Sequence, residues 1–404
     1  MFENKGGRYF WFSKYLIKHG YEPIIACANV IHNSSEFIDT RNKKYIIKEV
    51  DNIPFVFIKT ITATGNGIKR FINMFQFYYN LFPVSKEIVR IFGRPDVILA
   101  SSPHPLVMLA GIKIAQKLKI PCVCDILDLW PEAIFAFYNL NQNSVLGKLL
   151  VAGEHFIYKK ADALIFSKEG EIDYIREKKW DIENGGDIDI RRAYFITIGV
   201  DVHDFNSNKK NMILDDEDLL SDDFKIIYAG AIRPVNNVDK IVETAACLKN
   251  YDDIKFLIYG DGFQREMLEN KIKELGLLNI SFKGKVNKQY IPYILNKSSV
   301  NLLNYKQTDY YLKRGDSSNK LFEYMAAGKP IISTVKMGYS LIERYNCGIE
   351  IENATPAQIA NAILTVKTMS KDEYERLGYN ASQGAKDIDV KILTKKIISV
   401  LENI

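Results

Sequence analysis

The sequence lacks several features that would assign it to a narrow class. Its five cysteines among 404 residues form no CxxC pair, which excludes a disulfide framework and a zinc site. The uncharged stretch 97–112 is broken by Pro103-His104-Pro105 and is shorter than the roughly 20 apolar residues that span a bilayer. The first residues, MFENKGGRYF, contain no hydrophobic signal core. We therefore expect a cytoplasmic protein.

Neither sign of charge dominates the chain. There are 54 basic and 49 acidic residues; the first 200 residues hold 26 and 21 of them, and the remainder holds 28 of each. The whole excess of +5 thus lies in the first half and hints at an anionic partner there, but it is too weak to indicate nucleic-acid binding. The composition, 47% hydrophobic and 25% charged, excludes disordered, collagen-like and coiled-coil chains.

Short β-rich apolar runs alternate with helical patterns, which predicts βαβ units and parallel sheets covered on both faces. The expected strands are Pro23–Val30, Pro54–Lys59, Asp96–Ser101, Ile120–Ile126, Asp162–Phe166, Tyr194–Ile198, Phe224–Gly230, Ile254–Gly260, Ser299–Tyr305 and Pro330–Thr334. The expected helices are Arg8–His19, Leu106–Lys119, Asn237–Lys249, Gln264–Leu275 and Asn319–Ala327. A chain of this length is too long for one ordinary sheet. We predict an α/β fold of two facing Rossmann-like domains with a cleft between them.

The polar, acidic stretch 206–223 is the expected linker. It gives an N-terminal domain of residues 1–203, a C-terminal domain of residues 204–385, and a last helix, 386–404, that packs back on the first domain. A Rossmann-like domain normally opens with a buried strand and a glycine turn. Only five residues precede Gly6-Gly7, so either the first strand is missing from this chain or the sheet is built without it.

The most informative segment runs from Gly315 to Ile332. Ser317 or Ser318 can cap a helix that Gly328 ends. The exposed amides at its start, beside Lys320, would attract a phosphate, and Glu323 one turn later could accept hydrogen bonds from both hydroxyls of a ribose. On residue types alone, a capped helix with a Lys–Glu surface pair is an equally good interpretation.

Two further loops follow predicted strands, where α/β sheets bind ligands. In the first, Gly230 permits close approach of a ligand and Arg233 can bind a diphosphate with paired donors. The second is Gly260-Asp261-Gly262, a sequence that is more often only a tight turn. All three segments fall in one half of the chain, in an order that can converge on one crevice.

In the first half, Asp128 and Glu132 follow a buried strand and are suited to bind sugar hydroxyls or accept a proton, while Trp130 offers a face for a sugar ring. The alternative is an Asp cap with Pro at the helix start. His104 also lies at a strand end and is a further candidate for the acceptor. We interpret Asp187-Ile188-Asp189 as a solvated loop and not as a metal site.

These residues resemble the retaining GT-B glycosyltransferases of the large family-4 type, especially those of bacterial surface-polysaccharide synthesis. The matching motifs are the Gly-Gly turn, the segment 128–132, Gly199-Val200-Asp201, Tyr228-Ala229-Gly230, Gly260-Asp261-Gly262, Asn319-Lys320-Leu321-Phe322-Glu323 and Ala327-Gly328-Lys329-Pro330. This chain departs from the family pattern at four positions. Gly315 stands where the family often has a second acidic residue, Ala231 and Asn236 where it usually has Arg and Lys, and Leu127 where it commonly has a first-domain His.

The resemblance implies a donor site in the second domain for a UDP- or GDP-linked sugar, with no metal and no cofactor. Glu323 would hold the ribose, the segment from Ser318 through Asn319 and Lys320 to Leu321 the diphosphate, and Arg233 the leaving phosphate. The Gly6-Gly7 loop would approach the diphosphate when the cleft closes. Asp128, Arg233, Lys320 and Glu323 are the expected catalytic residues.

By the same resemblance, the acceptor is a glycan on a polyprenyl diphosphate at the inner membrane face, as in O-antigen or capsule synthesis. The enzyme would be a hexosyl- or N-acetylhexosaminyltransferase. The stretch 69–82 has Phe71, Phe75, Tyr78 and Phe82 at helical spacing after a basic pair, which fits an interfacial helix but is better explained by a helix in the core. No Ser–His or Cys–His arrangement is present. A UDP-sugar 2-epimerase and a non-catalytic partner of the same fold remain alternatives.

Overall fold

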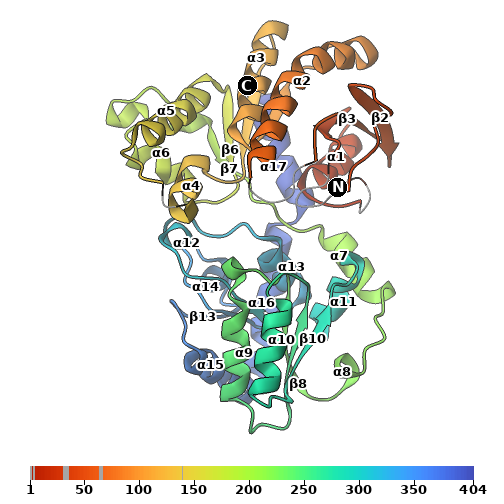
Figure 1. Ribbon diagram of the computed structural model, residues 1–404, viewed down its shortest axis with the longest axis vertical. Helices are drawn as coiled ribbons and strands as arrows, with labels where there is room; N and C mark the ends of the chain where they lie inside the picture. The colour runs from red at the N-terminus through yellow and green to blue at the C-terminus, as the bar shows by residue number, and fades with distance from the viewer. Residues whose placement is uncertain (1, 3–4, 31–35, 63–66, 139) are drawn as a thin grey trace. The chain divides into compact units, whose positions relative to one another are not determined.

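The computed structural model describes residues 2, 5–30, 36–62, 67–138 and 140–404. The chain forms two compact units, Met1–Thr197 with Leu393–Ile404, and Ile198–Ile392. The sequence placed the division at 203/204, a few residues later. Strands alternate with helices along most of the chain, except for three successive strands within residues 25–58. Each predicted strand and helix is present, with ends shifted by a few residues (Figure 1).

The second unit is built on one parallel sheet of strand order β10-β9-β8-β11-β12-β13. This is the order 3-2-1-4-5-6 of a doubly wound dinucleotide-binding fold. All strands are parallel, and the order in which the chain adds them reverses between β8 and β11. The strands are β8 (Phe224–Ala229), β9 (Ile254–Tyr259), β10 (Ile280–Gly284), β11 (Val300–Leu303), β12 (Ile331–Ser333) and β13 (Gly348–Glu350). The four inner strands are apolar and buried on both faces, as a parallel sheet covered by helices requires, whereas the edge strands β10 and β13 are only partly buried.

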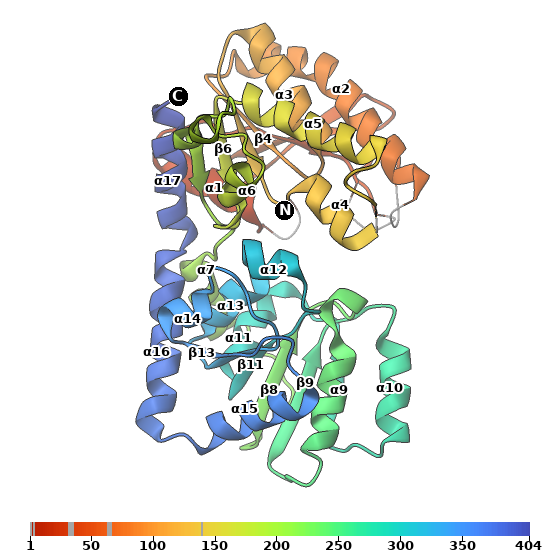
Figure 2. The same ribbon diagram turned by 90° about the vertical axis from the view of Figure 1, so that its left-hand side faces the viewer.

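Helices cover both faces of this sheet, and Figure 2 shows α9 and α10 on one side and α13 and α16 on the other. The first layer contains α9 (Val238–Cys247), α10 (Arg265–Glu274) and α15 (Pro356–Thr368). The second contains α7 (Val202–Asn211), α11 (Ile291–Asn296), α13 (Asn319–Ala327), α14 (Leu341–Tyr345) and α16 (Lys371–Asp387). The short helix α12 (Asp309–Arg314) precedes α13.

The predicted linker is wrong in position. Residues 206–223 belong to the second unit and contain most of α7 and all of α8 (Glu217–Leu220). Phe205 and Leu219 are buried in the core of that unit, which anchors the stretch despite its acidic composition. The polar residues of the stretch face solvent and suggested a linker, although Leu219 within it and Phe205 just before it are buried.

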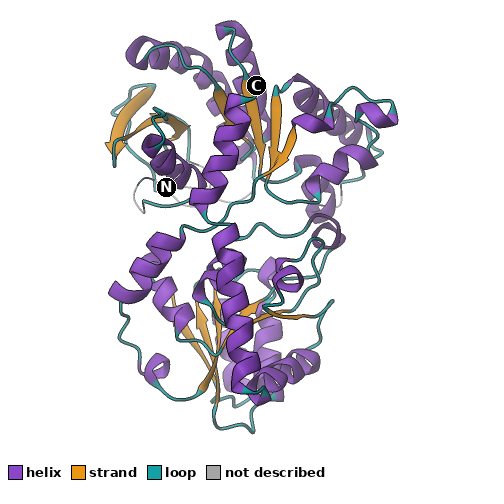
Figure 3. Cartoon of the chain, turned by 180° about the vertical axis from the view of Figure 1, so that it is seen from behind, coloured by secondary structure: helices purple, strands orange, loops and turns teal. Residues whose placement is uncertain are grey.

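The first unit has two sheets, which appear as separate groups of strands in Figure 3. A parallel sheet has the order β4-β5-β6-β7, with strands Ile98–Ser101, Cys122–Ile126, Ala163–Phe166 and Ala193–Phe195. A smaller sheet has the order β1-β3-β2, with strands Ile25–Ala28 (β1), Tyr45–Val50 (β2) and Ile53–Ile58 (β3). The helices are α1 (Arg8–Lys18), α2 (Ile68–Phe92), α3 (Pro105–Leu118), α4 (Trp130–Tyr138), α5 (Val145–Lys160) and α6 (Glu171–Glu177).

The antiparallel hairpin of β2 and β3 was not predicted. Asp51 and Asn52 both have positive φ, 51° and 61°, at its two-residue turn, which is the requirement of a type I′ turn. Half of the β2 residues are exposed and none is buried, so the strand lacks the alternation that would have indicated it.

The chain ends in α17 (Val390–Glu402), whose residues from Leu393 onward group with the first unit. The Tyr21 hydroxyl donates to Glu402 at 2.8 Å. At the other end, α1 is the first described element, and Gly7 directly before it has φ 102°, a conformation that favours glycine.

Candidate functional site

A cavity of about 750 Å³ opens in the second unit at the carboxyl ends of β8, β9 and β10. Four basic side chains line it, namely Arg233, Lys285, Lys288 and Lys320, against two acidic ones, Asp261 and Glu323. The rest of the lining includes Ala229, Gly230, Ala231, Tyr259, Gly260, Gly262, Phe263, Val286, Ile291 and Asn319. The three segments singled out in the sequence therefore converge, and the excess of positive charge favours an anionic ligand.

The glycines of this site are required by close backbone packing. A Cβ at Gly260, where φ is +149°, would lie 1.8 Å from the Gly230 carbonyl oxygen. A Cβ at Gly262 would lie 2.1 Å from the oxygen of Ile232. The two loops are also joined by hydrogen bonds from Gly230 N–H to Tyr259 O (2.9 Å) and from Ile232 N–H to Asp261 O (2.9 Å). The loop after β9 thus holds the Arg233 loop in place. It is therefore more than the tight turn that Gly260-Asp261-Gly262 usually indicates.

The start of α13 offers unused amides toward the cavity. The Ser318 N–H donates to Asp316 Oδ1 (3.0 Å), and the Leu321 N–H faces the Ser318 hydroxyl at 3.5 Å. The amides of Asn319 and Lys320 have no acceptor within the described part of the chain. These two donors, with the positive end of the helix dipole, are suited to bind a phosphate.

Lys320 carries the positive charge nearest to these amides. Its ammonium donates to Asn236 Oδ1 at 3.0 Å and lies over the Tyr305 ring, 4.0 Å from the ring centre, and more distantly over that of Tyr228. No carboxylate pairs with it among the described residues. Burial lowers its pKa to about 7, although Asp316 opposes the shift.

Glu323 and Arg233 lie at the cavity with different exposure. The Glu323 side chain is 16% exposed, and its Oε1 lies 3.4 Å from the Lys288 ammonium. Arg233 is exposed, and its guanidinium has no hydrogen bond or ion pair within the residues that the structure describes. Its paired donors therefore remain available for an oxyanion.

One expectation for this helix needs correction, and one departure from the family pattern has a physical reason. Leu321 is buried in the core of the second unit, so its side chain cannot contact a donor, and its amide faces the cap. Gly315, at the family's acidic position, has φ +84°, and a Cβ there would lie 2.7 Å from the Gly338 carbonyl oxygen. The departure at Gly315 is thus imposed by backbone packing.

Sequence reasoning missed several members of the site. Lys285 and Lys288 follow β10, a strand that was not predicted. Asn236 was noted only as a departure, whereas its Oδ1 accepts from Lys320 and its Nδ2 donates to Ala231 O at 2.7 Å. Tyr305 looked like part of a buried strand. The one sequence signal for these four residues is that each lies shortly after a strand.

In the first unit, Asp128 follows β5 and is mostly exposed, and the residue directly before α4 is Leu129. Asp128 thus forms an ion pair in place of the helix cap that was the alternative interpretation: Lys168 Nζ lies 3.0 Å from Asp128 Oδ1. Trp130 and Glu132 are half-buried in the first turn of α4. Gly6 and Gly7 precede α1 in this unit, and their approach to a donor stays a prediction.

His104 does not have the open position expected of an acceptor-binding residue. It is 7% exposed at the start of α3, with its ring edge-on to Phe77. Burial, together with the nearby charge of Arg70, lowers its pKa to about 4. Its Nδ1 has no hydrogen-bond partner within the described residues. A buried neutral ring is a structural histidine and not a surface for sugar.

The Asp187 and Asp189 carboxylates bind different partners. Asp187 lies 2.8 Å from His155 and 2.6 Å from Lys159, whereas Asp189 forms a two-point pair with Arg191. Because each carboxylate is held by its own cation, the pair is part of a solvated loop.

The first half of α2 is not the core helix that we favoured. Only Met74, Phe77 and Val84 of the helix are buried, whereas Phe71 and Phe75 are 58% and 49% exposed. Ile68, Ile72 and Tyr79 are exposed as well, so an apolar stripe follows the outer face beside the basic pair Lys69-Arg70. We call these five residues, Ile68, Phe71, Ile72, Phe75 and Tyr79, the α2 stripe.

The two Rossmann-like units define the GT-B fold of glycosyltransferases. Solved structures share it over almost the whole chain. Sucrose-phosphate synthase from Thermosynechococcus elongatus has a TM-score of 0.69 at 15% identity, covering 98% of this chain and 92% of that one. A UDP-forming α,α-trehalose-phosphate synthase from Burkholderia xenovorans has a TM-score of 0.72 at 10% identity, covering 97% and 96%. At these identities the likeness establishes the fold alone.

Residues 210–384, which lie within the second unit, match the family described as "Glycosyl transferases group 1". HepE of Anabaena, solved in complex with UDP-glucose, has a TM-score of 0.61 at 15% identity and covers 87% of each chain. TuaH of Bacillus subtilis, whose name assigns it to teichuronic acid biosynthesis as a glycosyltransferase, is 24% identical over 265 residues. That match is 65% of this chain and 62% of TuaH, less than two thirds of the relative's length.

Proposed function

We propose that this protein transfers a sugar from a nucleotide-sugar to a glycan acceptor. The observation that carries the proposal is the cavity of the second unit, where Glu323, four basic side chains and two unused helix amides converge. Glu323 accepts hydrogen bonds from the ribose hydroxyls. Arg233, Lys320 and the amides of Asn319 and Lys320 hold the diphosphate. The group 1 match over this unit and the UDP-glucose complex of HepE support a nucleotide-sugar as the ligand.

Catalysis in this proposal rests on the leaving group. As the glycosidic bond to the diphosphate breaks, negative charge grows on the phosphate oxygens, and fixed donors around them stabilise that charge more in the transition state than in the ground state. Arg233 and Lys320 supply this stabilisation without a metal or a further cofactor. Retention of the anomeric configuration is proposed from the family resemblance.

The acceptor side of the proposal lies in the first unit. Asp128, Trp130 and Glu132 bind acceptor sugars, and the acceptor is a lipid-linked glycan in bacterial surface-polysaccharide synthesis. The name of TuaH supports a cell-surface polymer. We place the donor among UDP- and GDP-linked hexoses and N-acetylhexosamines.

The test is nucleotide release from UDP-glucose, UDP-N-acetylglucosamine and GDP-mannose, with and without a polyprenyl-diphosphate sugar acceptor. We expect release that depends on the acceptor, and about tenfold weaker donor binding in Glu323→Gln, because one strong hydrogen bond to a carboxylate is lost. Glu375→Gln, on an exposed carboxylate of α16, is the matched control and should bind the donor as the wild type does.

Two outcomes of that assay would count against transfer. An altered nucleotide-sugar formed without acceptor would indicate the epimerase. Unchanged donor binding in a folded Glu323→Gln would mean that the cavity is not the donor site.

We also propose that the α2 stripe lies on the cytoplasmic face of the inner membrane, where a lipid-linked acceptor is found. No helix in the described residues is long and apolar enough to span a bilayer. An apolar stripe beside a basic pair is instead typical of interfacial binding.

The membrane proposal predicts cosedimentation with vesicles that contain anionic lipid. Phe71→Ser/Phe75→Ser should weaken this binding by about tenfold or more, because two apolar rings no longer insert. Tyr379→Ser removes an equally exposed ring from α16 of the second unit and should change nothing. Equal sedimentation of the wild type and the double variant would contradict the proposal.

A further inference from the structure

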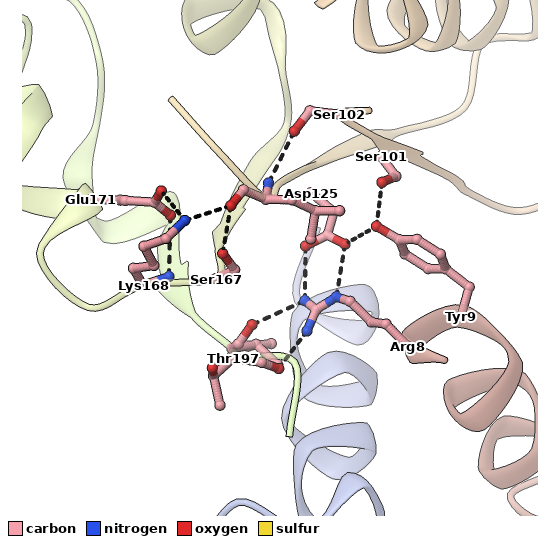
Figure 4. A network of polar contacts seen from close by, with 11 residues as sticks. Arg8, Tyr9, Ser101, Ser102, Asp125, Ser167, Lys168, Glu171 and Thr197 are labelled. Atoms are coloured by element: carbon pink, nitrogen blue, oxygen red, sulfur yellow. Dashed lines mark hydrogen bonds and ion pairs between the residues drawn. The ribbon is translucent and has the colours of Figure 1, made fainter. Parts of the chain in front are cut away.

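Polar side chains from neighbouring strands fix the turn that follows β5. The Leu127 N–H donates to the Ser102 hydroxyl at 3.0 Å, and the Leu127 carbonyl oxygen accepts from the Ser167 hydroxyl at 2.9 Å. Ser102 follows β4 and Ser167 follows β6, so the turn is held from both sides of β5 (Figure 4). The position of Asp128, the next residue, is therefore defined by the sheet.

Lys168 adds the charged part of this arrangement. Its ammonium donates to Leu127 O at 2.7 Å, to Asp128 Oδ1 at 3.0 Å and to Glu171 Oε1 at 3.1 Å. The ammonium of lysine has three protons, so these contacts use its full donor capacity. The Lys168 and Glu171 side chains are 6% and 0% exposed, whereas that of Asp128 is 63% exposed. A buried cation thus holds one oxygen of an exposed carboxylate.

The other oxygen of Asp128 is left for a ligand. No hydrogen bond occupies its Oδ2 within the described ranges of the chain. A carboxylate fixed through one oxygen presents the other in a defined orientation, which costs less entropy on binding a sugar hydroxyl than a freely rotating side chain does. Buried Glu171 offsets the charge of Lys168, and burial raises the pKa of Glu171 while Lys168 opposes that shift.

We infer that Lys168 is a positioning residue for acceptor binding, which acts by orienting the Asp128 carboxylate toward a hydroxyl of the acceptor sugar. This inference rests on the proposed function, because it requires the acceptor to bind at Asp128. Lys168 itself touches no substrate in this arrangement, and its effect passes through Asp128 and the Leu127 carbonyl.

A double-mutant cycle on the acceptor KM tests the inference, with the donor saturating and polyprenyl-diphosphate sugar as the varied substrate. We expect Lys168→Met and Asp128→Asn each to raise the acceptor KM by about tenfold, the worth of one charged hydrogen bond. The double variant should be no worse than Asp128→Asn alone, since the two residues act as one unit. Donor affinity should be unchanged in all three.

Lys159→Met is the matched control, because Lys159 pairs with Asp187 on the surface of the same unit. It should leave both constants at wild-type values. If Lys168→Met does not fold, Lys168→Arg, which keeps the charge but not the compact three-proton head, takes its place in the cycle.

The outcomes separate this inference from the proposed function. Additive effects in the double variant, or donor affinity falling in parallel, would mean that Lys168 only stabilises the fold and would overturn the inference. An unchanged acceptor KM in folded Lys168→Met would do the same while leaving transfer intact. A wild-type protein that transfers to no acceptor overturns the proposed function and the inference with it.

Discussion

Affinity for a nucleotide-sugar should fall about tenfold between pH 6 and pH 8, because the protonated fraction of Lys320 falls by that factor about a pKa near 7. Affinity falls with rising pH because burial of the Lys320 ammonium in the protein without ligand lowers its pKa from 10.5 into this range. A bound diphosphate favours the protonated form, so binding takes up a proton above pH 7. UDP-glucose is the suitable ligand, since its diphosphate does not titrate in this range. Calorimetry in buffers of different ionisation enthalpy measures both the affinity and the number of protons taken up on binding.

Lys320→Met should weaken binding by up to about a hundredfold at pH 6 and remove the pH dependence, because a charged hydrogen bond in a partly desolvated site is lost. The variant without ligand should melt at a higher temperature than the wild type below pH 7, where the wild type must keep a desolvated charge. Lys320→Arg keeps the charge throughout this range and should also flatten the profile. A wild-type affinity that is constant from pH 6 to pH 8 would contradict the proposed role of Lys320.

The fold was predictable because its signals are local. The four inner strands of the second unit, such as Phe224–Ala229, are short apolar runs between helical patterns, whereas the edge strands β10 and β13 are not and were not predicted. The parts that failed have weak or misleading local signals. The β2 strand is half exposed. The acidic stretch 206–223 contains part of α7 and all of α8, because burial of Leu219 in the core outweighs the polarity of the stretch.

The lining of the cavity was predictable only where its residues lie close together in the sequence. Asn319, Lys320 and Glu323 lie on one helix, so their spacing could be read directly. The partner of Lys320, Asn236, is 84 positions away, and the pair of Lys168 with Asp128 spans 40. Such contacts depend on the order of strands in the sheet, which a single sequence does not contain.

The largest loss of stability is expected for Arg8→Met. Arg8 donates to both oxygens of Asp125, at 3.0 and 2.8 Å, and to the carbonyl oxygens of Ile196 (3.0 Å) and Thr197 (Figure 4). Burial disfavours the charge of Arg8, but the Asp125 carboxylate outweighs it and raises the pKa of Arg8. Removing the guanidinium leaves the Asp125 carboxylate, which is 1% exposed, with the Tyr9 hydroxyl at 2.7 Å as its one partner among the described residues. Breaking a buried pair in this way costs about 3–5 kcal/mol.

Hydrogen exchange at the β5 amides measures this loss in the first unit separately from the second. Arg191→Met is the control, because it removes a similar two-point Arg–Asp pair that is exposed and should change protection little. Arg8→Met/Asp125→Leu should recover part of the loss, since no buried charge then stays unpaired. Equal protection in Arg8→Met and Arg191→Met would show that burial adds nothing to the pair. The difference between them measures how firmly the start of α1, and with it the Gly6-Gly7 turn, is fixed to β5.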